Sequence, residues 1–333
     1  PKGVIVTERM LLASAAGCAL ASKCDPGDAF LMWEPMHHIG GPQLVIMALV
    51  HGARLVVVKR FSASRFWPLV RSEGVNKLHY LGGILEILLK SETRNNEQDH
   101  PIVLAFGGGA RPETRRDFIQ RFSIPIREVF GMTEASSFAT VDVRETEDSI
   151  GQVLPGMDAD VVAEDGQRVG DNVVGELIVR PRYPGLLTPG YLEDPETTAR
   201  LFRGEWLCTG DLARRDGQGN YYFLGRKTDS LRRRGENISA WEVETALSAH
   251  PDIAETAIVG VHSEIGEADI LCFVLMREGR PFDAAAIANW SREHLPRHHV
   301  PRYWKPVVHF ERTPSQRIKK ASLDHGVSDA IDV

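Results

Sequence analysis

The sequence has few cysteines, no long apolar run and no excess of positive charge. Its 333 residues include four cysteines and no Cys-x-x-Cys pair, which argues against a zinc site or a disulfide framework and favours reduced thiols in a cytoplasmic protein. The most apolar stretch, 44–58, is interrupted by His51, Gly52 and Arg54, so it falls short of the ~18 residues that a membrane helix needs. A formal net charge of −6 gives no field that would recruit nucleic acid.

Several common catalytic motifs are also missing. There is no G-x-x-x-x-G-K-[ST], which excludes a Walker-type NTPase, and no G-x-S-x-G or H-E-x-x-H. The adjacent His37 and His38 are expected on a strand. Because neighbouring side chains on a strand point to opposite faces, this pair does not predict a shared metal.

Helical and strand patterns alternate through the first two thirds of the chain. Residues 7–22 and 111–122 have helical spacing, the second starting at Pro112, whereas 54–61 and 101–110 are short apolar runs that end in turn residues. This alternation predicts βαβ units and a largely parallel sheet. The stretch 161–181 then changes to short β runs with Asp-Gly and Gly-Asp turns, which predicts a small antiparallel or barrel-like portion.

The last third has the pattern of a compact α+β unit. Ser239 and Glu242 form an S-x-x-E capping box at a helix start. Strands are predicted at 255–263, at 269–278 and near 305–310, with a helix at 283–295. We therefore predict an α/β fold, with a large domain over 1–225 and a small α+β C-terminal domain over 226–333. The boundary is placed in the charged, glycine-flanked stretch 225–229.

Three stretches suit nucleotide chemistry. In "VFGMTE", Phe130 can stack on a base, the Thr133 hydroxyl can reach a phosphate and Glu134 can hold Mg²⁺, although a plain helix start with a Thr cap has the same letters. In "LCTGDL", Asp211 in a Gly-Asp turn at a strand end suits a ribose diol, but surface turns often look the same. The glycines of 107–110 would let a flat ligand approach bare backbone, or would simply form a strand-to-helix turn.

Taken in order along the chain, these stretches resemble the motifs of the adenylate-forming superfamily, which contains acyl-CoA synthetases, nonribosomal-peptide adenylation domains and luciferases. The motifs are "PKG", "PMHHIGG", "GGGARP", "VFGMTE", "GELIVRP", "YLEDPETT", "WLCTGD", "GRKTDSLRRRGENISAWEVE" and "RTPSQRIKK". Their wording looks most like the carnitine/crotonobetaine-CoA ligase-like branch of acyl-CoA synthetases.

The resemblance implies an ATP-dependent acyl-CoA ligase. A carboxylate would attack the α-phosphate of ATP to give acyl-AMP and pyrophosphate, and the thiol of coenzyme A would then displace AMP to form a thioester. ATP, Mg²⁺, coenzyme A and a small carboxylate are therefore the expected ligands, and a homodimer stays open. Pro1-Lys2-Gly3 resembles only the end of the family's phosphate-binding loop. The chain is thus expected to be a fragment lacking the start of that loop and an N-terminal segment of the large domain.

The resemblance also assigns roles to particular residues. The adenine side would be formed by a turn and a strand end, namely Gly108, Gly109, Ala110, Phe130, Gly131 and Met132. The catalytic and phosphate side would be formed by Lys2, His38, Thr133 and Glu134, the last two being the metal contacts. Asp211 and Arg226 would hold the ribose, and His37 falls at the family's aromatic gate position.

The small domain is expected to rotate about a hinge at Thr228 or Asp229 between the two half-reactions. This rotation would bring the loop 235–237 toward the thioester side. There a group of charged and glycine residues is expected to meet coenzyme A, namely Arg232, Arg233, Arg234, Gly235 and Glu236.

One motif departs from the family. The C-terminal motif usually carries a catalytic lysine after a glycine, and here Gln316 and Arg317 stand at those positions. Arg317 keeps the positive charge, yet arginine and lysine are not interchangeable where geometry matters, and losing one stabilising donor costs about 10²–10³ in rate. A shift in register would let Lys319 or Lys320 substitute.

Two alternatives to the ligase therefore stay open. One is an adenylation enzyme that loads a carrier-protein thiol, and the other is a catalytically weak nucleotide- or acyl-binding relic. The acyl pocket is expected from residues 37–43, 79–85 and those after Glu134. Their mixture of apolar, small and polar side chains suits a short, polar or fatty acyl group equally.

Overall fold

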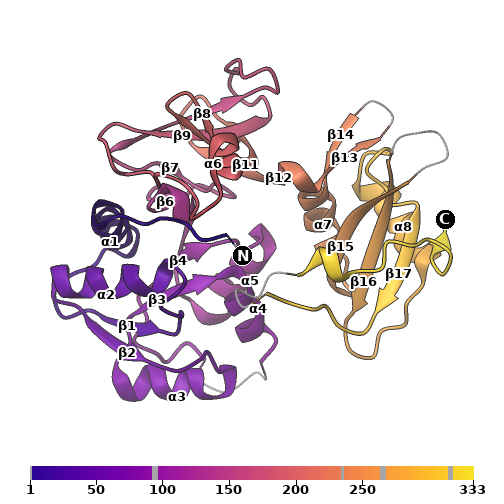
Figure 1. Cartoon of the computed structure of the whole chain (residues 1–333). Helices are drawn as coiled ribbons and strands as arrows, with labels where there is room; N and C mark the ends of the chain where they lie inside the picture. The colour runs from indigo at the N-terminus through magenta and orange to yellow at the C-terminus, as the bar shows by residue number, and fades with distance from the viewer. Residues whose placement is uncertain (1, 92–96, 234–235, 263–267, 314–317) are drawn as a thin grey trace. The chain divides into compact units, whose positions relative to one another are not determined.

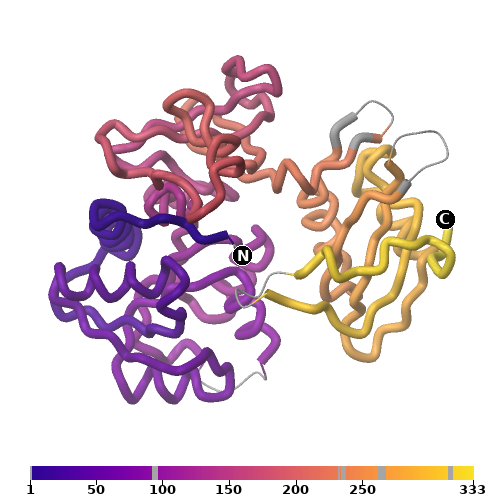
Figure 2. The backbone as a smooth tube through the Cα atoms, viewed as in Figure 1, coloured from indigo at the N-terminus to yellow at the C-terminus, as the bar shows by residue number. Residues whose placement is uncertain are grey.

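The computed structural model describes residues 2–91, 97–233, 236–262, 268–313 and 318–333. The chain forms two compact units, Pro1–Thr209 with Ala213–Phe223 and Gly210–Leu212 with Leu224–Val333 (Figure 1 and Figure 2). Each unit has hydrophobic cores of its own. No helix in the described part of the chain is long and apolar enough to cross a lipid bilayer.

A seven-stranded sheet forms the base of the larger unit. Its order is β2-β1-β3-β4-β5-β6-β7, with parallel pairing from β2 to β5 and antiparallel pairing of β6 and β7. The strands are β1 (Ala29–Met32), β2 (Arg54–Val57), β3 (Lys77–Leu81), β4 (Leu104–Gly108), β5 (Ile126–Met132), β6 (Ser137–Val141) and β7 (Gln152–Val153). This topology confirms the predicted α/β fold with a largely parallel sheet.

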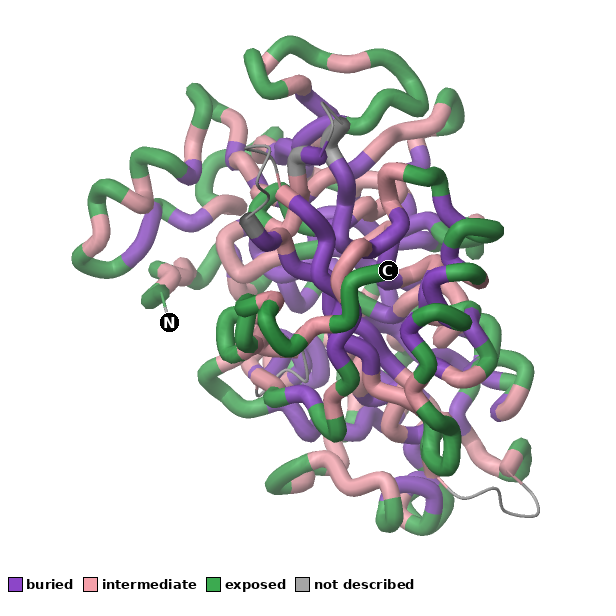
Figure 3. The backbone as a smooth tube through the Cα atoms, turned by 90° about the vertical axis from the view of Figure 1, so that its right-hand side faces the viewer, coloured by how far each residue is buried: buried purple, intermediate pink, exposed green. Residues whose placement is uncertain are grey.

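Helices cover both faces of this sheet. Leu31 packs into the core under α3, α4 and α5, whereas its neighbours Phe30 and Met32 pack into the core under α1 and α2. Successive side chains point to opposite faces of a strand, so β1 contributes to the cores on both faces of the sheet. Figure 3 shows the buried segments inside the exposed loops. The helices are α1 (Glu8–Ser22), α2 (Gly40–His51), α3 (Ala63–Glu73), α4 (Gly82–Leu89) and α5 (Pro112–Phe122).

Local signals explain where two of these helices begin and end. Thr7 Oγ1 accepts a hydrogen bond from the Met10 N–H at 3.2 Å and so caps α1. Pro112 is the first residue of α5, where its missing N–H costs nothing. Both helices end at a residue with left-handed backbone, Lys23 (φ 48°) and Ser123 (φ 57°). The helices predicted from the spacing are confirmed to within a residue.

A second, antiparallel region completes the larger unit. Its strand order is β10-β11-β9-β8, with β12 against β11, and β8 pairs with β9 from Met157–Pro181 to Val162–Glu176. This confirms the predicted small β portion. The elements are β8 (Met157–Val162), β9 (Gly175–Pro181), α6 (Pro195–Leu201), β10 (Phe202–Arg203), β11 (Trp206–Arg215) and β12 (Tyr221–Arg226).

The smaller unit has the predicted α+β form. Cys272 and Trp304 lie in the core under α7 and α8, while Leu271 and Phe273 face a core covered by the C-terminal residues. Ser239 Oγ accepts the hydrogen bond that begins α7. The elements are η2 (Lys227–Asp229), β13 (Ser230–Arg233), β14 (Glu236–Ser239), α7 (Ala240–Ser248), β15 (Ile253–His262), β16 (Ala268–Met276), α8 (Ala284–His294), β17 (Tyr303–Val307), η3 (Lys320–Ser322) and β18 (Ile331–Asp332).

Two local predictions are wrong. His37 and His38 lie in a turn between β1 and α2 rather than on a strand, because β1 already ends at Met32. Asp211 lies inside the ten-residue strand β11 rather than in a turn at a strand end. Gly210 has φ +71°, so the glycine locally reshapes the strand without ending it.

Candidate active site

The site residues predicted in the larger unit gather at one edge of its sheet. The Gly108 turn follows β4, and Thr133 follows β5, which pairs with β4 in parallel. The turn with His38 follows β1, a parallel strand of the same sheet. Ligands of open α/β sheets bind outside the carboxyl ends of the strands, which is where these residues lie.

The turn after β4 has little room on its inner side. A Cβ on Gly82 would lie 2.0 Å from Gly109 O, and one on Gly107 would lie 1.9 Å from Tyr80 O. Gly109 itself is exposed, has φ +82°, and would place a Cβ in open space. The backbone of this turn is therefore accessible from one side only, at Gly109.

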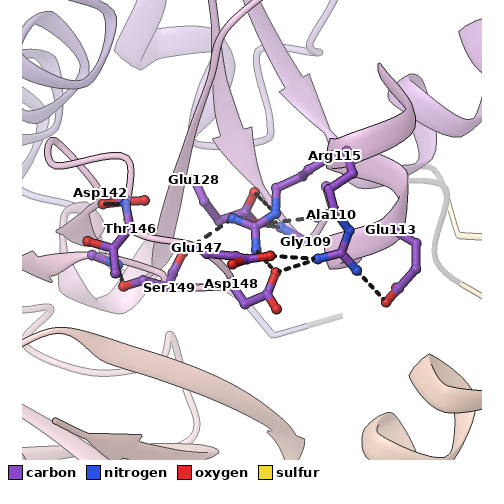
Figure 4. A network of polar contacts seen from close by, with 12 residues as sticks. Gly109, Ala110, Glu113, Arg115, Glu128, Asp142, Thr146, Glu147, Asp148 and Ser149 are labelled. Carbon is purple, nitrogen blue, oxygen red and sulfur yellow. Dashed lines mark hydrogen bonds and ion pairs between the residues drawn. The ribbon is translucent and has the colours of Figure 1, made fainter. Parts of the chain in front are cut away.

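Behind the turn lies a buried carboxylate that the sequence analysis does not identify. Glu128 Oε1 accepts hydrogen bonds from the N–H of Gly109 at 2.8 Å and of Ala110 at 3.3 Å. The hydroxyl of Tyr80 donates to Glu128 Oε2 at 2.5 Å, and Arg115 Nε lies 4.0 Å from the same oxygen. Figure 4 shows Glu128 with Gly109, Ala110 and Arg115.

Burial dominates the electrostatics of this carboxylate. It raises the pKa of Glu128 to about 7, against the lowering effect of Arg115, Tyr80 and the two backbone N–H groups. The pKa of Tyr80 is raised well above its usual value by burial and by the neighbouring carboxylate. The Arg115 guanidinium also lies 3.6 Å from Asp148, which links the network to the loop after β6 (Figure 4).

The strand end after Glu128 carries the predicted base-stacking residue. Phe130 is buried, and its ring centroid lies 6.2 Å from that of Phe223. Gly131 is exposed, and a Cβ there would lie 1.6 Å from Ser137 O, so only glycine fits this position. Met132 is half-buried. Base stacking by Phe130 stays a prediction.

Lys2 and Glu134 are brought together by Tyr191, a residue of the "YLEDPETT" motif to which we assign no role from the sequence. The Tyr191 hydroxyl donates to Glu134 Oε1 at 2.6 Å. Lys2 Nζ lies 4.9 Å from the centroid of the Tyr191 ring. Thr133 precedes Glu134 in a 3-10 turn, η1 (Thr133–Ala135), so its hydroxyl belongs to the same corner of the unit.

Backbone pairing holds this corner in place. Leu192 N donates to Gly3 O at 2.7 Å, and Ile5 N donates to Gly190 O at 3.0 Å. Val4 pairs with Tyr191 between these bonds. The first residues of the chain are thus fixed to the segment that carries Tyr191.

The Glu134 carboxylate fits a magnesium ion. Within the described part of the chain, Tyr191 is the one side chain that hydrogen-bonds to the Glu134 carboxylate. Its hydroxyl contacts Oε1 and not Oε2. Mg²⁺ is commonly held by one or two carboxylates together with substrate phosphates, so a single protein carboxylate suffices. The described residues contain no group of three or more potential metal-ligating side chains.

His38 lies in a polar cluster on the acyl side of the predicted site. A Cβ on Gly40 would meet His38 Nδ1 at 3.3 Å, Glu34 Cγ at 3.4 Å and His79 Cε1 at 3.4 Å. His79 and Glu34 are both buried and hydrogen-bonded to each other through His79 Nδ1. His38 Nδ1 accepts from the Gly40 N–H at 3.2 Å.

In the smaller unit, the two residues predicted at the ribose are in contact. Arg226 Nε lies 2.9 Å from Asp211 Oδ1, and Asp211 is buried while about half of the Arg226 side chain is exposed. The contact with the guanidinium orients this buried carboxylate. The pair fits the expected recognition of two hydroxyls.

The residues predicted to meet coenzyme A do not all lie where a ligand could reach them. Arg233 is buried, donates to the carbonyls of His298 and Val300 at 3.1 and 2.8 Å, and lies 3.2 Å from Asp269. These contacts favour a structural role for Arg233. The other predicted residues of the group lie outside what the structure describes, either wholly or in their side chains, namely Arg232, Arg234, Gly235 and Glu236.

The predicted hinge coincides with the short 3-10 turn η2. In this turn Thr228 is exposed and Asp229 is half-buried. Lys320 Nζ lies 2.8 Å from Glu244 and 3.7 Å from Asp229, and Lys319 pairs with Glu311. Both lysines are therefore engaged inside the smaller unit, while Arg317 lies outside the described residues.

Comparison with known proteins covers nearly the whole chain. Residues 1–192 match the family described as AMP-binding enzyme, and residues 242–317 match its C-terminal domain. Sulfoacetate–CoA ligase of Cupriavidus necator is 32% identical over 328 residues, which are 97% of this chain and 64% of that protein. Crotonobetaine/carnitine–CoA ligase of Salmonella agona is 26% identical over 329 residues, again 97% of this chain and 64% of that protein.

The fold is similar as well. O-succinylbenzoate coenzyme A synthetase from Bacillus subtilis, solved in complex with ATP and magnesium ion, superposes with a TM-score of 0.84 at 25% identity, covering 97% of this chain and 67% of that chain. The chain therefore spans about two thirds of the length of the proteins it matches. The chain belongs to the family of AMP-binding enzymes, within the adenylate-forming superfamily predicted from its motifs.

Proposed function

We propose that the protein is an ATP-dependent acyl-CoA ligase. A carboxylate and ATP give acyl-AMP and pyrophosphate, and the thiol of coenzyme A then displaces AMP to give the acyl thioester. The observation that carries this proposal is the juxtaposition at one sheet edge. The glycine turn after β4 and the segment from Phe130 to Glu134 after β5 stand on adjacent parallel strands, where a nucleotide can span both.

The first half-reaction needs positioning and charge neutralisation more than covalent help. Attack by one anion on another is opposed by repulsion, so cationic and hydrogen-bonding groups must surround the phosphates. Lys2 supplies a cation, and Thr133 supplies a hydroxyl from the turn that holds Glu134. A magnesium ion held by Glu134 supplies charge neutralisation at the phosphates.

Asp211 orients the nucleotide through its ribose. An ionised carboxylate is a pure acceptor and can receive hydrogen bonds from both hydroxyls of a diol. Arg226 contacts Oδ1 from the side and fixes the carboxylate plane. This arrangement distinguishes ribose from deoxyribose, which has one hydroxyl fewer.

The acyl side is polar near His38. The buried Glu34 and His79 hydrogen-bond to each other, and a Cβ on Gly40 beside them would be in tight contact with both side chains. The names of the relatives point the same way, because sulfoacetate, 2-succinylbenzoate and carnitine all carry polar groups. A carboxylate panel should therefore contain short, polar acids beside fatty acids.

The second half-reaction requires the thiol of coenzyme A to reach the acyl-AMP carbonyl. We expect the smaller unit to rotate about Thr228 or Asp229 for this step. Arg232 and Arg234 are the proposed contacts for coenzyme A phosphates. Arg233 contributes indirectly, because its buried contacts hold the hairpin that bears its two neighbours.

The test measures AMP release by the full-length gene product over this carboxylate panel, with and without coenzyme A. AMP release that needs both a carboxylate and coenzyme A supports the ligase. Pyrophosphate exchange into ATP without thioester formation on free coenzyme A points instead to a carrier-protein acceptor.

ATP binding with no exchange at all would contradict enzymatic activity and would match a binding relic. The variant R317K then identifies the cause, because a gain of exchange assigns the defect to Arg317.

A further inference from the structure

Glu128 is an ionisable residue in the middle of β5. The residues on either side of it, Arg127 and Val129, are buried as well. Only 3% of the surface of Glu128 is exposed, and it lies between α5 and the β3–β4–β5 part of the sheet. An interior carboxylate is unfavourable unless hydrogen bonds and opposite charge compensate it. We therefore expect the contacts of the two Glu128 carboxylate oxygens to indicate its role.

The contacts of Glu128 come from three different elements. One oxygen holds two consecutive N–H groups of the turn after β4, and the other meets the Tyr80 hydroxyl from β3 and the Arg115 guanidinium from α5. A carboxylate can accept several hydrogen bonds at once, and bonds to its charged form are stronger than neutral ones. Glu128 thus ties the turn to the strand and to the helix on either side of it.

The turn is also confined from the opposite direction. The Gly82 and Gly107 positions leave no space for a Cβ, so the backbone of the turn is packed closely against α4 and β3. Of the three glycines 107–109, Gly109 alone has nothing within 4 Å of a Cβ position. The turn therefore has its N–H groups fixed inward and one open, flat face at Gly109.

We propose that Glu128 is a positioning residue for the base of the nucleotide, because it holds the Gly109 and Ala110 N–H groups inward and so presents a rigid, bare backbone face to the adenine ring. This inference rests on the proposed function, since it assumes that a nucleotide binds at this edge. Glu128 does not touch the ligand. It acts through the turn.

The variant E128Q tests this role with little change in size. Its amide oxygen can still accept one backbone N–H, but the charge is lost, so the turn should be held less firmly. Isothermal titration at pH 8 should show AMP binding about tenfold weaker than in the wild type, since hydrogen bonds of this kind contribute about 1.4 kcal/mol, and 1.4 kcal/mol is tenfold. Discrimination of AMP from GMP should fall, while the affinity for ribose 5-phosphate should stay unchanged.

Two further variants separate positioning from general stability. Y80F removes the hydroxyl from the other oxygen and should weaken AMP binding less than E128Q does, because both backbone contacts remain. E113Q makes the same chemical change at the half-buried start of α5, where Glu113 pairs with Arg116 at 3.0 Å, and should leave AMP binding unchanged. Thermal unfolding of each variant verifies that it is folded.

A pH profile with adenosine, which carries no phosphate to titrate, adds an independent readout. Wild-type affinity should fall as the pH drops below about 7, where Glu128 takes up a proton. The profile of E128Q should be flat. The ionisable groups that face this carboxylate or its contacts are Tyr80, Arg115, Asp142 and Asp148.

The outcomes are distinguishable. A wild type that does not bind AMP would overturn the proposed function and this inference together. A wild type that binds AMP, with a folded E128Q of equal affinity and equal selectivity against GMP, would overturn this inference alone. A parallel loss of affinity for AMP and ribose 5-phosphate would also overturn it, because the effect would then not concern the base.

Discussion

At the scale of single residues, the site depends on polar groups that hold other polar groups. Tyr191 holds Glu134, Arg226 holds Asp211, and Glu128 holds the turn at Gly109. Such supporting contacts fix the orientation of groups that meet a ligand, and removing them commonly costs 10–100-fold in metal affinity or activity.

Y191F tests the contact to Glu134. The phenylalanine ring keeps its packing and its contact with Lys2 but no longer donates to the carboxylate. The Mg²⁺ concentration that gives half-maximal AMP formation should rise roughly tenfold, with the KM for the carboxylate substrate unchanged. Y222F is the matched control, because it removes a tyrosine hydroxyl that donates to Asp216 and not to Glu134. A normal Mg²⁺ dependence in Y191F would contradict the assignment.

The pKa of Glu128 also predicts how stability depends on pH. This pKa is about 7 in the folded protein against 4.5 for an unperturbed glutamate, so the folded state holds the proton more tightly than the unfolded state does. The free energy of unfolding therefore falls as the pH rises from 4.5 to 7, by on the order of 3 kcal/mol from this group. E128Q lacks this effect, so denaturant unfolding should show its stability relative to the wild type increasing over that range. A difference that is constant with pH would refute the raised pKa.

At the scale of elements, the turn after β4 is where strand, turn and helix constrain one another most closely. Gly82 opens α4, and ordinarily alanine is preferred to glycine inside a helix. Here a Cβ on Gly82 would lie 2.0 Å from the Gly109 carbonyl oxygen. A backbone oxygen cannot rotate aside as the end of a flexible side chain can.

G82A should therefore destabilise the protein in denaturant unfolding by about 1–3 kcal/mol, against its helix propensity. G170A serves as the control, because a Cβ at Gly170 meets no atom within 4 Å. Equal stability of the two variants would show that the turn can move aside at no cost.

Periodicity and caps predicted the elements well, because both are local properties of the chain. The helix over 7–22 and the capping box at Ser239 follow from spacing and hydrogen-bonding chemistry within a few residues. The supporting residues could not be predicted in this way. Glu128 gives one signal, because it and Arg127 are charged residues inside a strand. Its partners Tyr80 and Gly109 follow only from the order of the strands in the sheet.

The burial of Arg233 is a second feature that local sequence patterns could not predict. Three consecutive arginines suggest a charged surface, yet alternation along β13 turns the middle one inward onto Asp269 and two carbonyls. Only the packing of the hairpin against its surroundings determines that Arg233 is buried.

At the scale of the whole molecule, each unit has hydrophobic cores of its own, and among the described residues no core cluster contains members of both units. We expect calorimetry to resolve two unfolding transitions, since each unit can lose its own core without the other.

R233A should lower the melting temperature of the smaller unit only, because it leaves the buried Asp269 without one of its guanidinium partners. E128Q should alter only the transition of the larger unit. A single cooperative transition that both variants shift would contradict independent units.

The pairing of residues 3–5 with residues 190–192 joins segments that lie far apart along the chain. Closing so long a loop is opposed by chain entropy, so contacts of this kind form after local ones. During synthesis, the glycine turn and Glu128 can be in place once β5 has emerged, whereas Lys2 and Glu134 are joined only after Tyr191 leaves the ribosome. A nascent chain would thus have Glu128 in contact with the Gly109 turn well before Lys2 and Glu134 are joined through Tyr191, so this corner of the unit is completed late in synthesis.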